Sequence, residues 1–211
     1  DVLDVFVIMP ETIKSNWVCD TIIRYARAAK VPVIVLDGKH SGCTNITYEY
    51  GDSLENVIEH VITVHNCSDL FFMAGIKGNS FSDERIEAFK RVLSRHNIPF
   101  DEKTMLGYGD FWDIPTENVT KALIDSGRKL PQAIICANDS MAITVMKTLE
   151  AGRVRVPEDV IVTGFDSAYE ERLYSTTRLT TAIMDADELA KTVADAAYGY
   201  LKGDETPEDK H

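Results

Sequence analysis

Polar side chains stand where several buried strands of this chain are expected to end. Asn138 and Asp166 each come shortly after an apolar run that is typical of a strand, and Arg85 lies three residues after an expected helix N-cap at Ser82. Ligands of open α/β sheets bind beyond the carboxyl ends of the strands, so we expect these side chains to share one rim. There a carboxylate would accept hydrogen bonds from hydroxyls, an amide would donate and accept, and a guanidinium would donate through a planar fork.

Two aromatic residues extend this candidate site. Phe111 and Trp112 follow a strand expected to end near residue 108, and an aromatic face can stack on a sugar ring or a heterocycle. Each candidate also has a structural alternative, because an amide can cap a helix, a carboxylate can shape a turn, an arginine can pair with a neighbouring carboxylate, and a tryptophan can be core. The predicted ligand is a small polar molecule, sugar-like or nucleoside-like. Its predicted binding residues are Arg85, Phe111, Trp112, Asn138 and Asp166.

The spacings that catalysis or cofactor binding requires are missing from the sequence. Gly107 and Gly109 begin a dinucleotide-type pattern, but Trp112 stands where its third glycine belongs. A calcium-loop-like segment over residues 37–48 places Lys39 at a ligand position. Each of the five histidines is interpreted as an ordinary solvated or half-buried side chain. We therefore predict no enzymatic activity, no catalytic residue, no metal site and no cofactor, and we reject a small hydrolase or dehydrogenase.

The charge balance argues against nucleic-acid binding by this chain itself. Its 22 Lys and Arg residues against 34 Asp and Glu residues give a net charge of −12, whereas nucleic-acid-binding surfaces are basic. The wide spacing of the four cysteines favours reduced thiols. No apolar run approaches the roughly 18 residues of a membrane span. These features predict a cytoplasmic protein that does not enter a membrane.

Short apolar runs alternate with longer segments of helical period along the whole chain. Continuous apolar runs are typical of strands buried on both faces of a parallel sheet, and parallel strands need crossover helices. The sequence therefore predicts a doubly wound α/β architecture, with hinges near residues 50–52 and 175–177. The predicted strands are residues 5–9, 33–36, 70–73, 133–136 and 160–162, and the predicted helices are residues 17–30, 52–65, 86–93, 116–127, 141–149 and 189–200.

The chain resembles the effector-binding domain of LacI/GalR-type regulators, a periplasmic-binding-protein-like type I fold. The resemblance rests on residues 137–142, 156–160, 164–166 and 179–181, in that order. It implies two doubly wound parallel-sheet lobes, one formed by residues 1–50 plus 178–203 and the other by residues 51–177, followed by an acidic linker over residues 204–211. It also implies that the first lobe is incomplete, because the chain starts after the family's first two strand-helix units. A strand edge near residues 5–9 or 33–36 would then be open.

The resemblance also assigns roles to the candidate site residues. Arg85, Asn138 and Asp166 match the family's ligand-contacting arginine, asparagine and aspartate, and Phe111 matches its cleft aromatic. The implied protein is a homodimeric, cytoplasmic, LacI-family transcriptional regulator that signals by lobe closure on a small-molecule effector. It would reach DNA only through a separate N-terminal module. Ser167 stands where the family often has a second aspartate, so the family's sugar chemistry is not carried over unchanged.

Two alternatives stay open. Residues 109–112 with residues 115–116 are also similar to LacI-like sensor domains placed ahead of diguanylate cyclase or histidine kinase modules. The same fold also serves extracytoplasmic solute-binding proteins of transporters. A signal peptide or lipobox upstream would favour transport, whereas a DNA-binding or signalling module would favour regulation.

Overall fold

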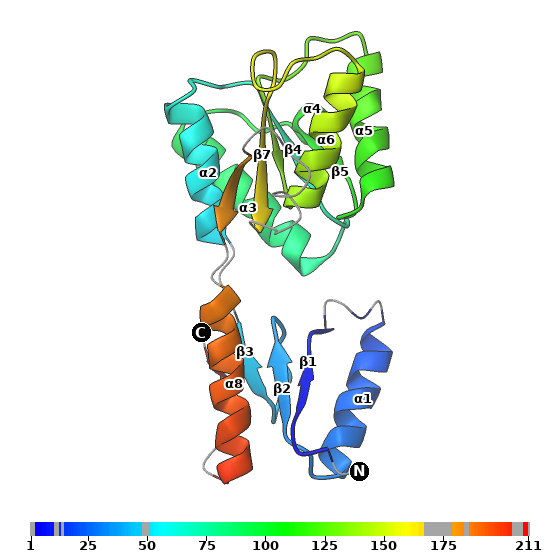
Figure 1. The fold of residues 1–211 in the computed structure, drawn as a ribbon, viewed down its shortest axis with the longest axis vertical. Helices are drawn as coiled ribbons and strands as arrows, with labels where there is room; N and C mark the ends of the chain where they lie inside the picture. The colour runs from blue at the N-terminus through cyan, green and yellow to red at the C-terminus, as the bar shows by residue number, and fades with distance from the viewer. Residues whose placement is uncertain are drawn as a thin grey trace. The chain divides into compact units, whose positions relative to one another are not determined.

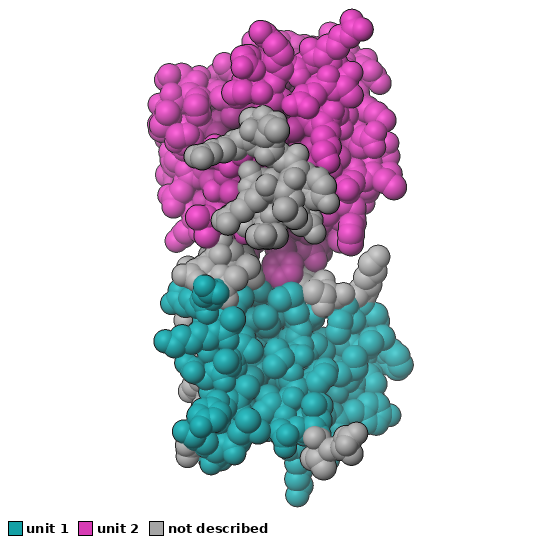
Figure 2. Space-filling model, viewed as in Figure 1, with its two compact units in different colours: residues 1–49, 185–211 teal, residues 50–184 magenta. Residues whose placement is uncertain are grey.

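In the computed structural model the chain forms two compact units (Figure 2). One unit combines residues 1–49 with residues 185–211, and the other is the continuous stretch of residues 50–184. The first crossing falls beside the hinge expected at residues 50–52, whereas the hinge expected at residues 175–177 lies outside the described residues. The structure describes residues 3–10, 13, 15–47, 51–166, 179–183, 186–203 and 209–210.

The first unit is a parallel sheet with helices packed on its faces. Helix α1 (Asn16–Ala28) connects the first two strands, and helix α8 (Ala186–Lys202) precedes the last one (Figure 1). All neighbouring strands of this sheet run parallel. The strand order is β1 (Phe6–Ile8), β2 (Val33–Leu36), β3 (Thr44–Ile46) and β9 (Asp209–Lys210).

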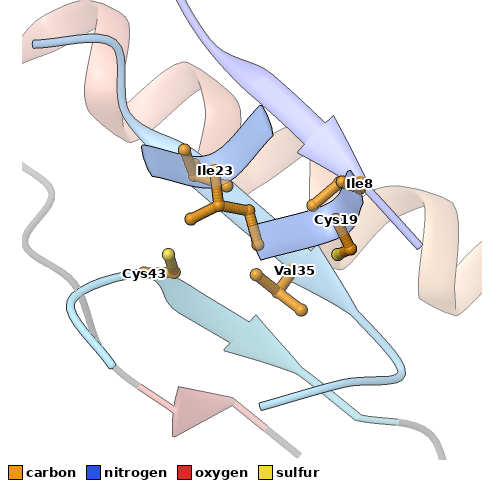
Figure 3. Close-up of a cluster of buried hydrophobic side chains, with 6 residues drawn as sticks. Ile8, Cys19, Ile23, Val35 and Cys43 are labelled. Carbon is orange, nitrogen blue, oxygen red and sulfur yellow. The ribbon is translucent and has the colours of Figure 1, made fainter. Parts of the chain in front are cut away.

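Successive residues of β2 pack against different helices. Val33 and Val35 join a buried cluster with Ile23 of α1 (Figure 3), whereas Ile34 joins a second cluster with Ala196 of α8. Side chains alternate between the two faces of a strand, so a helix on each face requires every residue of the strand to be apolar. Full burial of such a side chain contributes about 1.5–3 kcal/mol. The apolar run in the sequence thus reflects a sheet covered on both sides.

Two strands of this sheet, β3 and β9, lie outside the predicted strands. In β3 the buried Asn45 side chain accepts a hydrogen bond from the His40 N–H at 2.8 Å and donates one to the His40 carbonyl oxygen at 3.2 Å. Its amide group therefore keeps hydrogen-bond partners although it is buried. The prediction of a linker over residues 204–211 is wrong at Asp209–Lys210, because these residues pair with β3. Of the two strand edges predicted to be open, only β1 lies at an edge of the described sheet, since β2 is flanked by β1 and β3.

The second unit is a five-stranded parallel sheet with crossover helices. Every residue of β4 and β6 is buried, as their apolar runs predict. The assignment of residues 178–183 to the first lobe is wrong for the described residues 179–183, because β8 pairs with β7 in the second unit. The strand order is β5 (Leu106–Tyr108), β4 (Leu70–Ala74), β6 (Ala133–Cys136), β7 (Ile161–Asp166) and β8 (Thr180–Ile183). The helices are α2 (Gly51–Thr63), α3 (Ser80–Arg95), α4 (Glu102–Met105), α5 (Asp113–Asp125) and α6 (Asp139–Ala151).

The predicted α/β class with two parallel-sheet units is therefore confirmed. The predicted helices are all present, with ends displaced by a few residues. Within the described ranges, no helix combines the length and the apolarity that crossing a bilayer would require.

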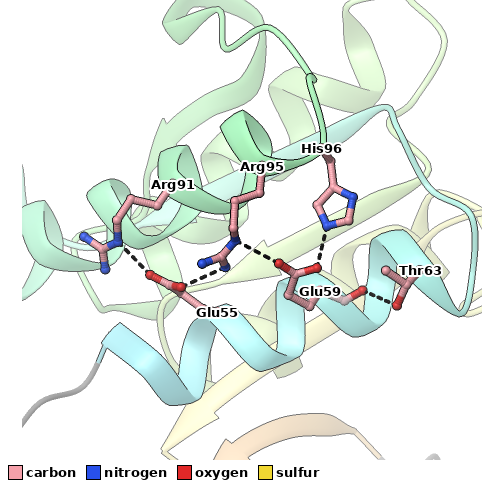
Figure 4. Close-up of polar contacts among 6 residues, drawn as sticks. All are labelled: Glu55, Glu59, Thr63, Arg91, Arg95 and His96. Atoms are coloured by element: carbon pink, nitrogen blue, oxygen red, sulfur yellow. Dashed lines mark hydrogen bonds and ion pairs between the residues drawn. The ribbon is translucent and has the colours of Figure 1, made fainter.

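Helices α2 and α3 are joined by a cluster of charged side chains (Figure 4). Glu55 accepts hydrogen bonds from Arg91 at 2.6 Å and from Arg95 at 2.8 Å. Glu59 is bound by Arg95 and His96. Burial alone would raise the pKa of Glu55, but hydrogen bonds from the two arginines and their charges outweigh burial and lower that pKa. The cluster fixes α3, the helix that carries one predicted site residue.

Candidate functional site

The Arg85 guanidinium lies at the carboxyl ends of two neighbouring strands. Its Nη1 donates to the carbonyl oxygen of Ala137, just beyond β6, at 2.9 Å. Its Nη2 lies 3.5 Å from Oδ1 of Asp166, the last residue of β7. The guanidinium carbon lies 4.3 Å from the centroid of the Phe165 ring and 5.6 Å from that of Phe111, an arrangement that stabilises a cation. One buried side chain thus gathers the ends of β6 and β7 and the loop after β5.

These contacts explain where Arg85 lies, and the macrodipole at the start of its helix does not. Helix α3 begins after Asn79, whose Oδ1 accepts the Ser82 N–H at 3.3 Å, so the expected N-cap at Ser82 is wrong. Arg85 therefore lies in the second turn, whereas the helix macrodipole acts mainly within the first. The side chain is only 7% exposed. A buried guanidinium without a counter-ion is strongly unfavourable, and Asp166 supplies that counter-ion.

Asp166 ends β7 with an unusual backbone. Its φ of 92° is strained for a residue with a Cβ, and such strain concentrates at functional sites. Burial raises the pKa of its carboxyl, and the nearby charge of Arg85 lowers it by less. The 3.5 Å separation from Arg85 is longer than an ordinary charge-assisted hydrogen bond of about 2.7–2.9 Å. The side chain is 34% exposed, so it can accept hydrogen bonds from solvent or from a ligand.

Phe111 lies in a tight loop after β5. Asp110 and Phe111 both have left-handed backbones, with φ of 54° and 62°. The Phe111 ring lies against Gly75, the residue after β4, where any Cβ would overlap the ring. The absence of a side chain at Gly75 therefore allows the loop to bring an aromatic face beside the buried guanidinium.

Asn138 combines a structural role with an available donor. It is the N-cap of α6, and its Oδ1 accepts the Met141 N–H at 2.8 Å. In the described part of the chain its Nδ2 group donates to no protein acceptor. Asn138 directly follows Ala137, so it lies next to the contact that Ala137 makes with Arg85. The capping alternative is confirmed, and its ligand role stays a prediction.

Trp112 stands apart from the other four predicted site residues. It occupies the N-cap position of α5 without a side-chain capping bond, and it is 69% exposed. Over the residues that the structure describes, no hydrogen bond or ring contact joins its indole to Arg85 or Asp166. The structure therefore brings Arg85, Phe111 and Asp166 together, places Asn138 next to Ala137, whose carbonyl oxygen binds Arg85, and leaves Trp112 on the surface.

A buried pair, Asp139 and Thr181, supports the same rim and is absent from the predicted site residues. Thr181 Oγ1 donates to Oδ1 of Asp139 at 2.6 Å, and Asp139 is 1% exposed. Gly164 of β7 lies against this carboxylate, where a Cβ would overlap it. The sequence feature that could have indicated this pair is Asp139 itself, which directly follows Asn138. A buried acid needs a hydrogen-bond partner. The pair fixes the start of α6 against β8.

A separate groove of about 580 Å³ lies between α5 and α6. Asp113, Lys121 and Lys147 are among its charged lining residues, and none of the five predicted ligand-binding residues lines it. Ser140 and Thr144 of α6 both donate to Asp113 Oδ1, at 3.1 and 3.0 Å. The groove is thus built by bonded helices, at a place distinct from the rim.

The rim carries groups with complementary hydrogen-bonding capacity. It offers a carboxylate, a guanidinium, an amide and an aromatic face, a set of groups that is able to bind a hydroxyl-bearing molecule. Burial raises the pKa of the Cys136 thiol at the end of β6, so this thiol stays protonated and is a poor nucleophile. Among the described side chains, no group of three or more His, Cys, Asp or Glu could hold a metal ion.

Comparisons with known proteins identify the family of this chain. The sequence model of the periplasmic binding protein-like domain family matches residues 60–211 of this chain. The HTH-type transcriptional regulator GalR of Lacticaseibacillus casei is 26% identical over 184 residues, which are 83% of this chain and 54% of the relative. The probable HTH-type transcriptional repressor ExuR of Bacillus subtilis (strain 168) is 27% identical over 194 residues, which are 90% of this chain and 57% of the relative. The chain thus spans about half the length of these curated relatives.

Solved structures show the same fold. One is a sugar-binding transcriptional regulator of the LacI family from Escherichia coli, complexed with phosphate. It superimposes with a TM-score of 0.79 at 24% sequence identity, and the match covers 98% of this chain and 73% of the regulator's chain. The transcriptional regulator CelR in complex with cellobiose has a TM-score of 0.82 at 19% identity, over 98% of this chain and 62% of its own. The chain therefore belongs to the periplasmic binding protein-like domain family, as an effector-binding domain of the LacI/GalR type.

Proposed function

We propose that this chain is the non-enzymatic effector-binding part of a cytoplasmic LacI-type transcriptional regulator. The matched relatives are HTH-type regulators, and the net charge of −12 on this chain suits a sensor rather than a DNA-binding module. DNA contact belongs to a separate helix-turn-helix module of the kind that the relatives' names indicate. Two matched Lac repressor structures are dimers, which supports a homodimer here.

The observation that carries this proposal is the position of Arg85. Its guanidinium touches the ends of β6 and β7 at once, through Ala137 and Asp166. Arg85 is only 7% exposed, and its carboxylate partner Asp166 lies 3.5 Å away. A ligand hydroxyl that bridges the guanidinium and the carboxylate would strengthen the contact between them. Such an arrangement has little use in a purely structural ion pair, for which a closer and fully buried carboxylate would serve better.

We propose a small hydroxyl-bearing molecule, sugar-like or nucleoside-like, as the effector. Asp166 accepts from its hydroxyls, Nδ2 of Asn138 donates to it, and Phe111 stacks on its apolar face. A ligand shifts a conformational equilibrium only by the difference in its affinity for the two states. The proposed signal is therefore closure of the protein on the effector, driven by hydrogen bonds that form only in the closed state.

The binding role of Asn138 can be tested apart from its capping role. Asn138→Asp keeps an oxygen for the Met141 N–H and keeps a good N-cap residue, but it replaces the Nδ2 donor by an acceptor. Sugars and nucleosides are screened by thermal shift, and the affinity of the best ligand is measured by calorimetry. We expect Asn138→Asp to lower that affinity about tenfold or more while the ligand-free melting temperature is unchanged.

The control is Asn97→Asp, the same substitution at an exposed position after α3, where the backbone is left-handed and not extended as at Asn138. Asn97→Asp should leave the affinity unchanged. Equal affinity for wild type and Asn138→Asp would contradict the proposed site, and so would the absence of binding to every class screened.

A further inference from the structure

Two histidines at the end of α2 face each other. The Nε2 atoms of His60 and His65 lie 3.2 Å apart. Their ring centroids are 4.9 Å apart with the planes at 81°, and both side chains are exposed. Without a third group between them, the hydrogen bond requires an N–H on one Nε2, which donates to the other Nε2. A metal ion can take the place of that proton.

The separation fits a shared metal ion. Zinc binds imidazole nitrogens at about 2.0–2.1 Å, so two nitrogen ligands of a tetrahedral ion lie about 3.3–3.4 Å apart. The 3.2 Å between the two Nε2 atoms is close to this value before any ion is bound. We propose that His60 and His65 form a two-histidine site for a late divalent transition metal ion, Zn²⁺, Ni²⁺ or Cu²⁺. Imidazole suits these ions, whereas Mg²⁺ and Ca²⁺ require oxygen ligands.

The backbone holds the two rings at this spacing. His60 lies in the last turn of α2, and its carbonyl oxygen accepts the Val64 N–H at 2.9 Å. The chain then turns through Asn66, with φ of 55°, and the N–H of the buried Cys67 returns to the Val61 carbonyl oxygen at 3.3 Å. His65 is therefore on a short turn tied at both ends. Ligands on ordered elements bind a metal ion with less reorganisation.

Water must complete the coordination. Glu59 precedes His60, but its two carboxylate oxygens are bound by Arg95 of α3 and by His96, the C-cap of that helix (Figure 4). No group of three or more metal-binding side chains occurs among the residues that the structure describes. The site is thus a two-point clamp between the end of α2 and the turn that leads to β4. An ion bound only to the folded form raises the free energy of unfolding by mass action.

The test is calorimetric titration of the 211-residue chain with ZnCl2, alongside His60→Asn, His65→Asn and the control His40→Asn. His40 is a histidine of the first unit, outside the clamp. We expect one Zn²⁺ per wild-type chain, a loss of affinity of at least about tenfold in each clamp variant, and unchanged affinity in His40→Asn. Both clamp residues are exposed, so metal-free melting temperatures should match that of wild type.

A second readout separates the clamp from weak binding elsewhere on the surface. Zn²⁺ should raise the melting temperature of wild type and His40→Asn but not that of the clamp variants. Cu²⁺ should bind more tightly than Zn²⁺. Equal Zn²⁺ affinity in wild type and both clamp variants would overturn the proposal, and so would the absence of Zn²⁺ binding to wild type.

Discussion

Thr181 Oγ1 donates a 2.6 Å hydrogen bond to Oδ1 of Asp139, which joins β8 to the start of α6. The acceptor is a carboxylate that is 1% exposed, and a hydrogen bond to a charged group contributes about 1.5–3 kcal/mol. Removing the hydroxyl leaves that oxygen with one donor fewer in a place that water does not reach.

Thr181→Val should therefore lower the free energy of unfolding by about 1.5–3 kcal/mol, measured by urea denaturation. The control is Thr180→Val, the neighbouring and exposed residue of β8, which should change it by no more than about 0.5 kcal/mol. Equal effects of the two substitutions would show that the bond contributes nothing.

The α2–α3 cluster predicts a loss of stability on neutralising Glu55. This carboxylate is only 12% exposed and is bound by two arginines. Glu55→Gln should lower the free energy of unfolding by about 1–3 kcal/mol at pH 7. Glu117→Gln, which removes one partner of an exposed ion pair with Lys121, should cost at most about 1 kcal/mol.

The stabilisation that Glu55 provides should be lost at acidic pH. Its pKa is lower in the folded protein than the ordinary value of 4.5, so the unfolded chain binds the proton more readily. The stabilisation is complete above pH 4.5 and is lost as the pH falls through the lower folded pKa. Denaturation of wild type and Glu55→Gln between about pH 7 and pH 3 should show their difference shrinking only at the acidic end. A difference that grows on acidification would be inconsistent with a lowered pKa.

Asp166 should show the opposite dependence. Its pKa is raised above the ordinary value of 3.8, mainly by burial, so the folded protein binds the proton more readily than the unfolded chain. Its contribution to the free energy of unfolding therefore falls as the pH rises from 3.8 through the folded pKa. Asp166→Asn removes this dependence, so ligand-free wild type should lose stability relative to the variant over that pH range. Urea denaturation of both proteins at several pH values gives the sign directly.

The packing of Phe111 on Gly75 predicts a coupled effect. Gly75→Ala places a Cβ inside the Phe111 ring position, so the ring and its loop must move. If Phe111 contributes to ligand binding, Gly75→Ala and Phe111→Ala should each weaken binding, and the double variant should be no weaker than the worse single one. Simple addition of the two losses in calorimetry would show that the residues act separately.

Much of the core could be predicted because burial on both faces leaves a strong pattern. The runs over residues 70–73 and 133–136 became the fully buried β4 and β6. The short strands β3 and β9 lack this pattern, since Thr44–Ile46 contains two polar residues and Asp209–Lys210 is charged. β3 and β9 pair with each other across most of the length of the chain, which local periodicity does not report.

The candidate site divides in the same way. Asn138 and Asp166 could be placed because parallel strands bring their carboxyl ends to one edge. The outward position of Trp112 and the inward position of Phe111 could not, because both depend on two successive left-handed residues and on space at Gly75. Backbone turns of this kind reverse the direction of neighbouring side chains without a change in composition.

The discontinuity of the first unit sets an order for folding on the ribosome. Residues 50–184 emerge as one stretch that contains the whole second sheet, whereas Ile34 of β2 packs with Ala196, which is synthesised only after that stretch. Domains generally fold as units during synthesis. The second unit can therefore fold first, while one apolar face of β2 stays uncovered until α8 is made. During synthesis, residues 1–49 would therefore need chaperone protection for longer than residues 50–184.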